Sequence, residues 1–294
     1  MKGISTAIAD PVPLVNDHDK RPAVKDLLRQ HSHAIEEIRK GLAQDVHYDA
    51  SKHDDLWILR FHLSHSRKRK HAIEAAKRTL AFRHLRKLDE DDIRPYPPGN
   101  GTNVKGVALK EYLDQCGEDA VTFCVTDPQR GVVAFLRPAS IDQSKLIKTF
   151  PKEHWLAAAL YMSEWSHQWV DYLTRTTGRL TKSVRLVDAQ DVTKSTNREH
   201  QRRDGKTATL MEDCYPQLLH GIYLCDAPAW IHIPFRLIRP LLPKRIVEKI
   251  DFVCPRKNAK ERKKFLHHIS EDHLPVRFGG KNEEWPVNFA LPTI

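Results

Sequence analysis

The sequence predicts an α/β fold: a mostly parallel, twisted sheet with flanking helices, preceded by a small all-helical module. Two observations predict it. A helical first third ends at a connector rich in proline and glycine, "IRPYPPGNGTN" from Ile93 to Asn103, and strand and helix patterns alternate beyond it. Strands that are separated by helices need crossover connections, which are typical of parallel sheets.

The part before the connector has the apolar spacing of helices. Three helices are expected there, over about residues 22–45, 54–65 and 70–88. Asp54 and Asp55 suit the positive N-terminal end of the second helix. We therefore expect a disordered start over residues 1–21 and a helical module over residues 22–100.

The part beyond the connector opens with a hairpin, "AVTFCVTD" and "GVVAFLRP", whose turn closes at Gly131. A long helix is expected from about Lys152 to Arg175. Further strands are "LTKSVRLVDAQ", "GIYLCDAP" and "KIDFVC", and helical or polar segments separate them. This pattern predicts one α/β domain over residues 101–285 and a C-terminal tail over residues 286–294.

The composition is that of a soluble globular protein, with 40% hydrophobic and 29% charged residues among 294. No run of about 18 uncharged apolar residues exists, so no helix is expected to span a bilayer. The start lacks the features of a signal peptide. The five cysteines are widely spaced and several lie in apolar runs, which indicates reduced, packed thiols and a cytoplasmic protein.

The net charge of +10 predicts attraction to polyanions, and both nucleic acid and anionic membranes qualify. No zinc-finger spacing and no aromatic RNA-binding strand is present, so we expect no nucleic-acid partner. The basic runs "SRKRKH", "REHQRR" and "RKNAKERKK" are each interpreted as solvated faces.

Signatures of enzymes and metal sites are absent from the sequence. It contains no "GxxxxGK[ST]", no "GxGxxG" and no "GxSxG", so we expect no catalytic residues and no enzymatic activity. His62 with His65, and His267 with His268, have no obvious acidic or cysteine partner. We interpret them as solvated surface histidines and expect no metal and no cofactor other than a bound ligand.

An oily segment, "AWIHIPFRLIRPLL", carries arginines and prolines and follows directly on the strand pattern of "YPQLLHGIYLCDAP". The latter run closely resembles the "YPE…Y…NAP" segment of the CRAL-TRIO lipid-binding domain. As in that family, an apolar helix follows, "FRLIRPLLPKRIVEKIDFV", and "HLPVRFGG" lies near the end. Upstream, "WILRFHLSHSRKRKHAIEAAKRTLAFR" is similar to the helical module of the family. The resemblance covers about Asp54 to Gly280.

The resemblance implies a cup that holds one lipid beneath a mobile gate helix, here about Trp230 to Pro243. The apolar side of the gate would cover acyl chains when closed and enter the membrane interface when open. Pro234 and Pro240 would supply hinges. Gate and membrane contacts are expected from Trp230, Phe235, Arg236, Ile238, Arg239, Leu241 and Leu242.

The lipid site that the resemblance implies comprises Ser183, Arg185, Gln217, Ile222, Leu224, Ile246, Lys249, Ile250 and Phe252. Members that bind phosphatidylinositol carry four polar residues, and three of these positions depart here, as Gln217, Ile246 and Ser66. Only Lys249 remains. Ser183 matches a serine that faces the phosphatidylcholine headgroup in some members, so we expect a phosphatidylcholine-like or other phospholipid in preference to phosphatidylinositol.

Arg185 follows Ser183 on the same face of a strand. A buried arginine is costly unless it is paired. Two interpretations stay open: it meets an acidic side chain, or it binds an anionic part of the ligand.

The resemblance thus implies a monomeric lipid-binding and phospholipid-transfer protein that visits anionic membranes reversibly. A binding protein for tocopherol, a retinoid or haem is the alternative, and a nucleic-acid-binding protein is a remote one.

Overall fold

A computed structural model describes residues 7–65, 68–99, 103–117, 120–125, 131–193, 197–239, 242, 244–283 and 291. Its α-helices are α1 (Val24–Gln30), α2 (Ser32–Leu42), α3 (Asp55–Ser64), α4 (Arg69–Leu85), α5 (Val107–Cys116), α6 (Gln143–Thr149), α7 (Lys152–Thr177), α8 (Arg198–Cys214), α9 (His232–Ile238), α10 (Lys244–Val247) and α11 (Ala259–Arg262). Its strands are β1 (Val121–Val125), β2 (Val132–Leu136), β3 (Ser183–Asp188), β4 (Leu219–Cys225) and β5 (Ile250–Val253). Short 3-10 helices are η1 (Val104–Gly106), η2 (Pro138–Ser140), η3 (Ala229–Ile231) and η5 (Val276–Phe278).

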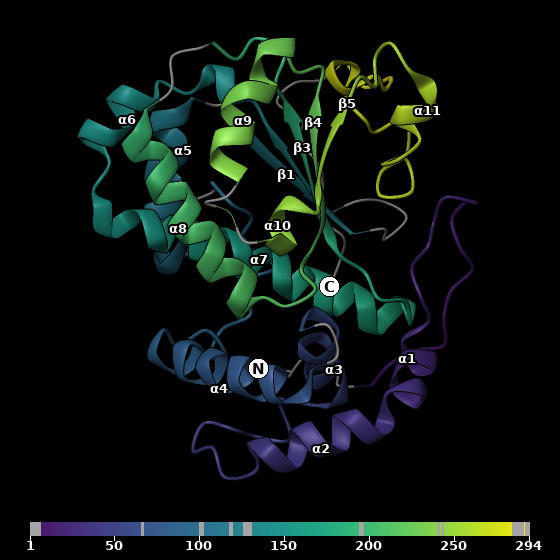
Figure 1. Cartoon of the computed structure of the whole chain (residues 1–294). Helices are drawn as coiled ribbons and strands as arrows, with labels where there is room; N and C mark the ends of the chain where they lie inside the picture. The colour runs from purple at the N-terminus through teal and green to yellow at the C-terminus, as the bar shows by residue number, and fades with distance from the viewer. Residues whose placement is uncertain are drawn as a thin grey trace.

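The five strands form one sheet in the order β1-β2-β3-β4-β5. β1 and β2 pair antiparallel as the predicted hairpin, and the other neighbours pair parallel. Figure 1 shows this sheet with helices in front of it and beside it, and the helical module below. The predicted α/β fold with a mostly parallel sheet is therefore confirmed.

The two faces of the sheet are covered differently. Helices α5, α7 and α8 pack on one face, and the segment after β5 packs on the other face (Figure 1). Phe265 and Phe278 of that segment are fully buried against Val184 and Leu186 of β3. Gly279 has a φ of +82°, and a Cβ there would lie 2.8 Å from the carbonyl oxygen of Pro255, which explains a glycine in "FGG".

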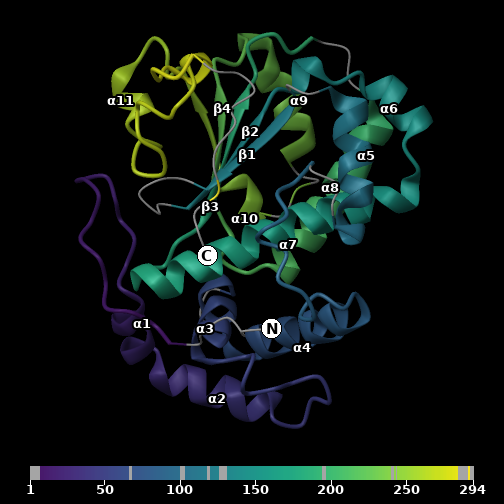
Figure 2. The same cartoon turned by 180° about the vertical axis from the view of Figure 1, so that it is seen from behind.

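The long helix α7 lies between the sheet and the helical module (Figure 2). It meets the module through buried ion pairs. Both oxygens of Glu164 lie 3.0 Å from the Arg83 guanidinium, and the Tyr215 hydroxyl donates to Glu164 at 2.8 Å. The tyrosine of the "YP" pair thus holds Glu164, the residue that links α7 to Arg83 of the module.

Local signals predicted the module well, with one difference. Asp54 caps α3, because its side chain accepts from the backbone N–H of Trp57 at 3.0 Å. The helix expected over 22–45 is two helices, α1 and α2, which meet at His31, whose φ of −110° and ψ of 12° are not helical. Apolar spacing continues across this break, and the sequence carries no proline or glycine to mark it.

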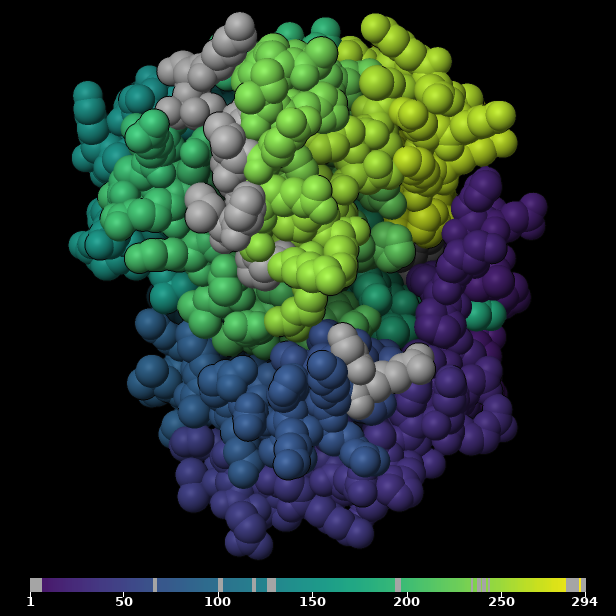
Figure 3. Space-filling view, viewed as in Figure 1, coloured from purple at the N-terminus to yellow at the C-terminus, as the bar shows by residue number. Residues whose placement is uncertain are grey.

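We expected residues 1–21 to be disordered, but residues 7–21 are held against the rest of the chain. The backbone N–H of Ala9 donates to the Arg175 carbonyl at 2.9 Å, and Asp19 is buried in an ion pair with Arg21. Figure 3 shows this purple segment beside the yellow C-terminal segment at the right of the molecule. A short polar stretch can therefore be held by hydrogen bonds that its own composition does not reveal.

The structure also bears on two expectations from the sequence, those on membrane-spanning helices and on the cysteines. No helix among the described residues is long and apolar enough to cross a membrane. All five cysteines are free thiols; four are buried and Cys254 is exposed.

Candidate functional site

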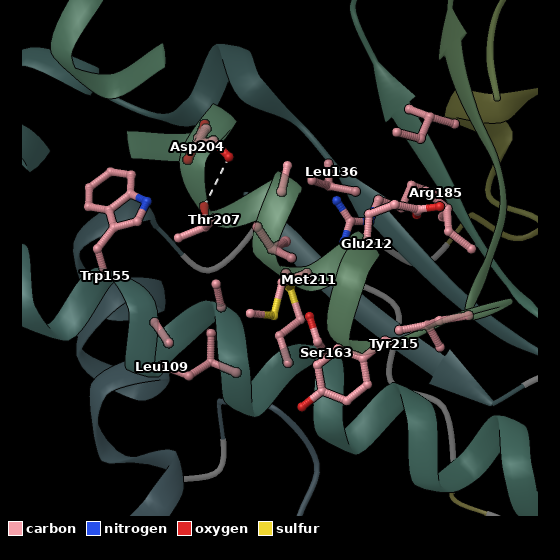
Figure 4. A pocket seen from close by; sticks show the side chains of 18 of the residues that line it. Leu109, Leu136, Trp155, Ser163, Arg185, Asp204, Thr207, Met211, Glu212 and Tyr215 are labelled. Carbon is pink, nitrogen blue, oxygen red and sulfur yellow. Dashed lines mark hydrogen bonds between the residues drawn. The ribbon is translucent and has the colours of Figure 1, made fainter. Parts of the chain in front are cut away.

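A cavity of about 250 Å³ lies between the sheet and the helices α5, α7 and α8. Most of its wall is apolar, and Figure 4 shows Arg185 and Glu212 at one end, away from Trp155 and Leu109. Its apolar lining includes Leu109, Leu113, Leu136, Trp155, Met162, Met211, Leu218, Leu219, Ile222 and Ile246. Polar lining comes from Tyr112, Ser163, Arg185, Asp204, Thr207, Glu212 and Tyr215.

Helix α8 supplies one wall of the cavity. This stretch is polar, yet it forms a 17-residue helix, and the side chain of its N-cap residue Asn197 accepts from two backbone N–H groups. Asp204, Thr207, Met211 and Glu212 face the cavity at spacings of three, four and eight residues. The sequence analysis missed these lining residues, although the helical spacing was a usable signal.

Arg185 projects from β3, the central strand, into the cavity (Figure 4). It makes no hydrogen bond or ion pair with any residue that the structure describes. Burial lowers the pKa of the Arg185 guanidinium, against the opposing charges of Asp204 and Glu212. The guanidinium remains charged at neutral pH. A cation that makes no hydrogen bond or ion pair with a described residue thus stands at one end of a mostly apolar cavity.

Asp204 and Glu212 are the two carboxylates in the cavity wall whose charges act on Arg185, and both are engaged elsewhere. Asp204 Oδ2 lies 3.2 Å from His200 Nδ1. Both carboxylate oxygens of Glu212 accept from Lys249 Nζ, at 2.9 and 3.0 Å. Glu212 is 8% exposed and the side chain of Lys249 is 22% exposed. The buried lysine–glutamate pair is therefore satisfied without Arg185.

The predicted polar residues occupy different surroundings. Ser183 is buried, and its hydroxyl donates to the Leu218 carbonyl at 3.0 Å, below the main cavity. Gln217 lies outside the cavity: its backbone N–H and its side-chain amide donate to Ser64 Oγ at 3.1 and 3.0 Å. Gln217 also has a φ of +62°, so the backbone turns there before β4 begins. Ser66 lies outside the described residues.

The predicted apolar residues share one face of the sheet. Ile222 pairs with Ile250 and Leu224 pairs with Phe252 across β4 and β5. Ile222 lines the cavity together with Ile246. Ile250, Leu224 and Phe252 are half-buried and continue the same face toward α9.

Helix α9, His232–Ile238, lies within the segment that we expected to form the gate, about Trp230 to Pro243. The ring of Phe235 packs edge-on against Phe252, with ring centroids 5.2 Å apart, and His232 also contacts Phe252 at 4.4 Å. On the outside, Ile233 is 67% exposed beside the exposed Arg236. This short helix thus has one face against the sheet and an outer face that combines an apolar and a cationic side chain.

The rest of the gate prediction is partly outside the described residues. Arg239 is exposed, and Trp230 and Leu242 are half-buried. The side chain of Ile238 lies outside the described residues, as do Pro240 and Leu241. Pro234 falls in the first turn of α9, where a helix does not need its N–H, so the helix forms across it.

The histidines that we interpreted as solvated are not. His62, His267 and His268 are 3%, 8% and 3% exposed. His267 and His268 are buried because the turn after α11 lies against β4, where the rings of His220 and His268 lie 4.6 Å apart between centroids. His62, on α3, is buried beside His31, with ring centroids 5.0 Å apart. Sequence spacing alone cannot reveal these contacts.

A family model, that of the CRAL/TRIO domain, matches residues 118–280, more than half of the chain. Patellin-5 of Arabidopsis thaliana is 31% identical over 71 residues, 24% of this chain. The SEC14 cytosolic factor of Eremothecium gossypii is 30% identical over 78 residues, 26% of the chain, and that of Candida glabrata is 32% identical over 74 residues, 25% of the chain. The crystal structure of Sfh5 shares the fold, with a TM-score of 0.50 at 13% identity over 82% of both chains.

The matched segments span a small part of these relatives. They cover 10% of Patellin-5 and 24% and 23% of the two SEC14 cytosolic factors.

Proposed function

Because this chain belongs to the CRAL-TRIO family, we propose that it binds one amphiphilic lipid in the cavity and exchanges it with membranes. The acyl part lies against the apolar wall, and an anionic group of the ligand meets Arg185. One observation carries this proposal: a guanidinium without an ion pair among the described residues stands at one end of a mostly apolar cavity.

The energetics of exchange support a covered cavity. Each methylene moved into water costs about 0.8 kcal/mol, so a two-chain lipid crossing through solvent faces a barrier of roughly 20 kcal/mol. An apolar cavity that opens only at the membrane avoids this cost. Because such exchange breaks no covalent bond, the proposed function requires no catalytic residue.

The size of the cavity bears on the ligand. At about 250 Å³ it lies below the roughly 300–1,000 Å³ of sites for drug-sized molecules. A two-chain phospholipid therefore needs more space than this cavity offers, and we propose that α9 provides it by moving away from Phe252. A smaller, single-chain anionic amphiphile is the second candidate, because it needs less movement.

The proposed headgroup preference depends on which side chains of the predicted site can still bind a headgroup. Gln217 is engaged with Ser64, Ile246 is apolar, and Lys249 is held by Glu212. Inositol hydroxyls placed there would lack partners, at about 1–3 kcal/mol for each buried group left unpaired. A phosphate as in phosphatidylcholine needs only Arg185. We therefore propose that a phosphatidylcholine-like lipid is preferred over phosphatidylinositol.

The membrane contact rests on charge and on the outer face of α9. A net charge of +10 attracts anionic surfaces, at about 1 kcal/mol for each well-placed cation. Ile233 can enter the interface while Arg236 and Arg239 meet headgroups. Two of the relatives are named cytosolic factors, which supports a cytoplasmic protein that associates with membranes peripherally.

A transfer assay between vesicles tests the proposal. The protein should move labelled phosphatidylcholine faster than labelled phosphatidylinositol, and Arg185→Gln should reduce phosphatidylcholine transfer. Faster transfer of phosphatidylinositol would contradict the headgroup assignment. No transfer of either lipid, with tight binding of a fatty acid, would favour the second candidate.

A further inference from the structure

We propose that His220, His267 and His268 bind a transition-metal ion of the zinc, nickel or copper class. This site would lie on the face of the sheet away from the lipid cavity. The three imidazoles each offer one nitrogen, and these nitrogens all lie within 4.8 Å of one another.

An irregularity of β4 turns His220 toward the other two histidines. Ser183 pairs with Leu219 and the next residue, Val184, pairs with Gly221, so His220 is an extra residue in the register. Leu219 and Ile222, three residues apart, consequently both line the lipid cavity. In a regular strand only alternate residues share a face. The shift places His220 on the opposite face, against the turn that carries His267 and His268.

The geometry is close to that of a three-histidine site. Ring centroids lie 3.9 Å apart for His267 and His268, 4.6 Å for His220 and His268, and 5.7 Å for His220 and His267. Zinc–nitrogen bonds of about 2.0–2.1 Å at tetrahedral angles require nitrogens about 3.3 Å apart. The rings therefore need to approach one another by no more than about 1.5 Å, which rotation of the imidazoles can supply.

His267 presents a ring nitrogen that a metal could take. The residue is 8% exposed, and its Nδ1 is buried without a hydrogen-bond partner among the described residues. A buried polar atom without a partner is uncommon and calls for an explanation, and coordination to an ion would give this nitrogen a partner.

A groove of about 400 Å³ leads to the three histidines. Two of the cations along it are balanced, since Lys264 pairs with Asp251 at 2.6 Å and Arg21 with Asp19 at 2.9 Å. Lys182 has no ion pair with a described residue. Three protein ligands leave the fourth position of a tetrahedral ion open, and a water or a small anion near Lys182 can fill it from the groove.

Titration of the tag-free full chain with Co²⁺, followed by its visible absorption, tests the site directly. We expect one ion per chain with the spectrum of a tetrahedral complex, displaced by Zn²⁺. Zn²⁺ should also raise the melting temperature, because an ion that binds only the folded chain stabilises it.

His220→Ala is the informative variant, because His220 is exposed and its removal leaves the buried pair in place. Loss of an outer-shell partner alone costs about 10–100-fold in metal affinity, so loss of this ligand should weaken Co²⁺ binding at least about tenfold. His33→Ala is the matched control, since His33 has a side chain that is 80% exposed and lies on α2; its affinity should equal that of the wild type.

Two results would overturn the proposal. One is Co²⁺ binding by His220→Ala as tight as in the wild type. The other is a chain that binds no Co²⁺ or Zn²⁺, whether or not inorganic phosphate raises its melting temperature; a phosphate effect without metal binding would identify the groove as an anion site instead.

Discussion

The ammonium of Lys249 lies 2.9 and 3.0 Å from the two carboxylate oxygens of Glu212, although Glu212 lines the same cavity as Arg185. This contact keeps Glu212 from pairing with Arg185, and Asp204, the other carboxylate in the cavity wall, lies 3.2 Å from His200 Nδ1. Arg185 is thus left without an ion pair among the described residues. The proposed binding of an anionic group depends on this arrangement.

Removing Arg185 should weaken ligand loading directly. A hydrogen bond to a charged group contributes about 1.5–3 kcal/mol, so Arg185→Ala should lower the affinity for a phosphatidylcholine probe by roughly 10- to 100-fold. Fluorescence titration with a labelled lipid measures this. An unchanged affinity would mean that Arg185 does not contact the ligand.

Releasing Glu212 should have the same effect indirectly. In Lys249→Met the Glu212 carboxylate loses its partner and can turn to Arg185, which then attracts an anionic ligand less. Loading should fall in this variant and recover in the double variant Lys249→Met, Glu212→Gln. Lys40→Met, at a side chain that is 73% exposed, is the control. If Glu212→Gln does not restore loading, Lys249→Met does not act by releasing Glu212 toward Arg185.

The outer face of α9 should enter the membrane. Ile233→Asp places a charge where an exposed isoleucine now stands, so transfer should fall strongly while the fold, measured by circular dichroism, stays unchanged. Phe235→Asp combined with Ile238→Asp should also abolish transfer, but Phe235 packs on Phe252, so that variant disturbs the closed state as well. Val46→Asp, at a position that is 89% exposed, is the control for Ile233→Asp. Equal transfer rates in Ile233→Asp and wild type would remove this helix from the mechanism.

Binding to vesicles should depend on charge and on salt. Because the screening length shortens as ionic strength rises, binding to anionic vesicles should fall with added salt. At about 1 kcal/mol for each cation, Arg236→Gln with Arg239→Gln should weaken it by roughly tenfold or more. Sedimentation with vesicles measures both effects. If neutral and anionic vesicles bind equally at low salt, the basic faces have another role and nucleic acid should be tested.

Stability should fall in acid in part through His167 on α7. Burial lowers the pKa of His167 to about 4, and the charges that face it are the Glu164 and Asp171 carboxylates and the Arg83 and Arg60 guanidiniums. The unfolded histidine titrates near 6.5, so between pH 6.5 and about 4 the unfolded chain binds a proton that the folded chain does not. The free energy of unfolding should therefore decrease across this window as pH falls, by up to about 1.4 kcal/mol per pH unit from this group.

Urea unfolding at pH 7, 6 and 5 measures the effect of His167. The loss of stability should be smaller in His167→Gln, which cannot take up this proton. An identical pH dependence in the two proteins would mean that His167 is not a source of the acid lability.

Short-range signals predicted much of the fold. The cap at Asp54, the hairpin of β1 and β2, and the alternation that places Ser183 and Arg185 on one face all depend on neighbours in the chain. The position of Tyr215 was recognised from its motif, but its hydrogen bond to Glu164 joins residues 51 apart and became visible only in the structure.

The less predictable parts are those that depend on distant contacts. Gln217 was expected at the headgroup, but a turn with positive φ and the hydroxyl of Ser64 hold it outside the cavity. Glu212 belongs to a polar stretch whose lining role depends on where α8 lies. His220 meets His267 only because β4 is irregular, and no spacing in the sequence encodes that.

The most direct test of the central claim is mass spectrometry of whatever is extracted from the purified, tag-free protein. The account predicts about one amphiphilic lipid per chain, with an anionic group such as a phosphate, and much less of it bound to Arg185→Ala purified in the same way. A chain that carries no lipid, or one whose bound molecule has no anionic group and is retained equally by Arg185→Ala, would contradict the assignment of the cavity and of Arg185.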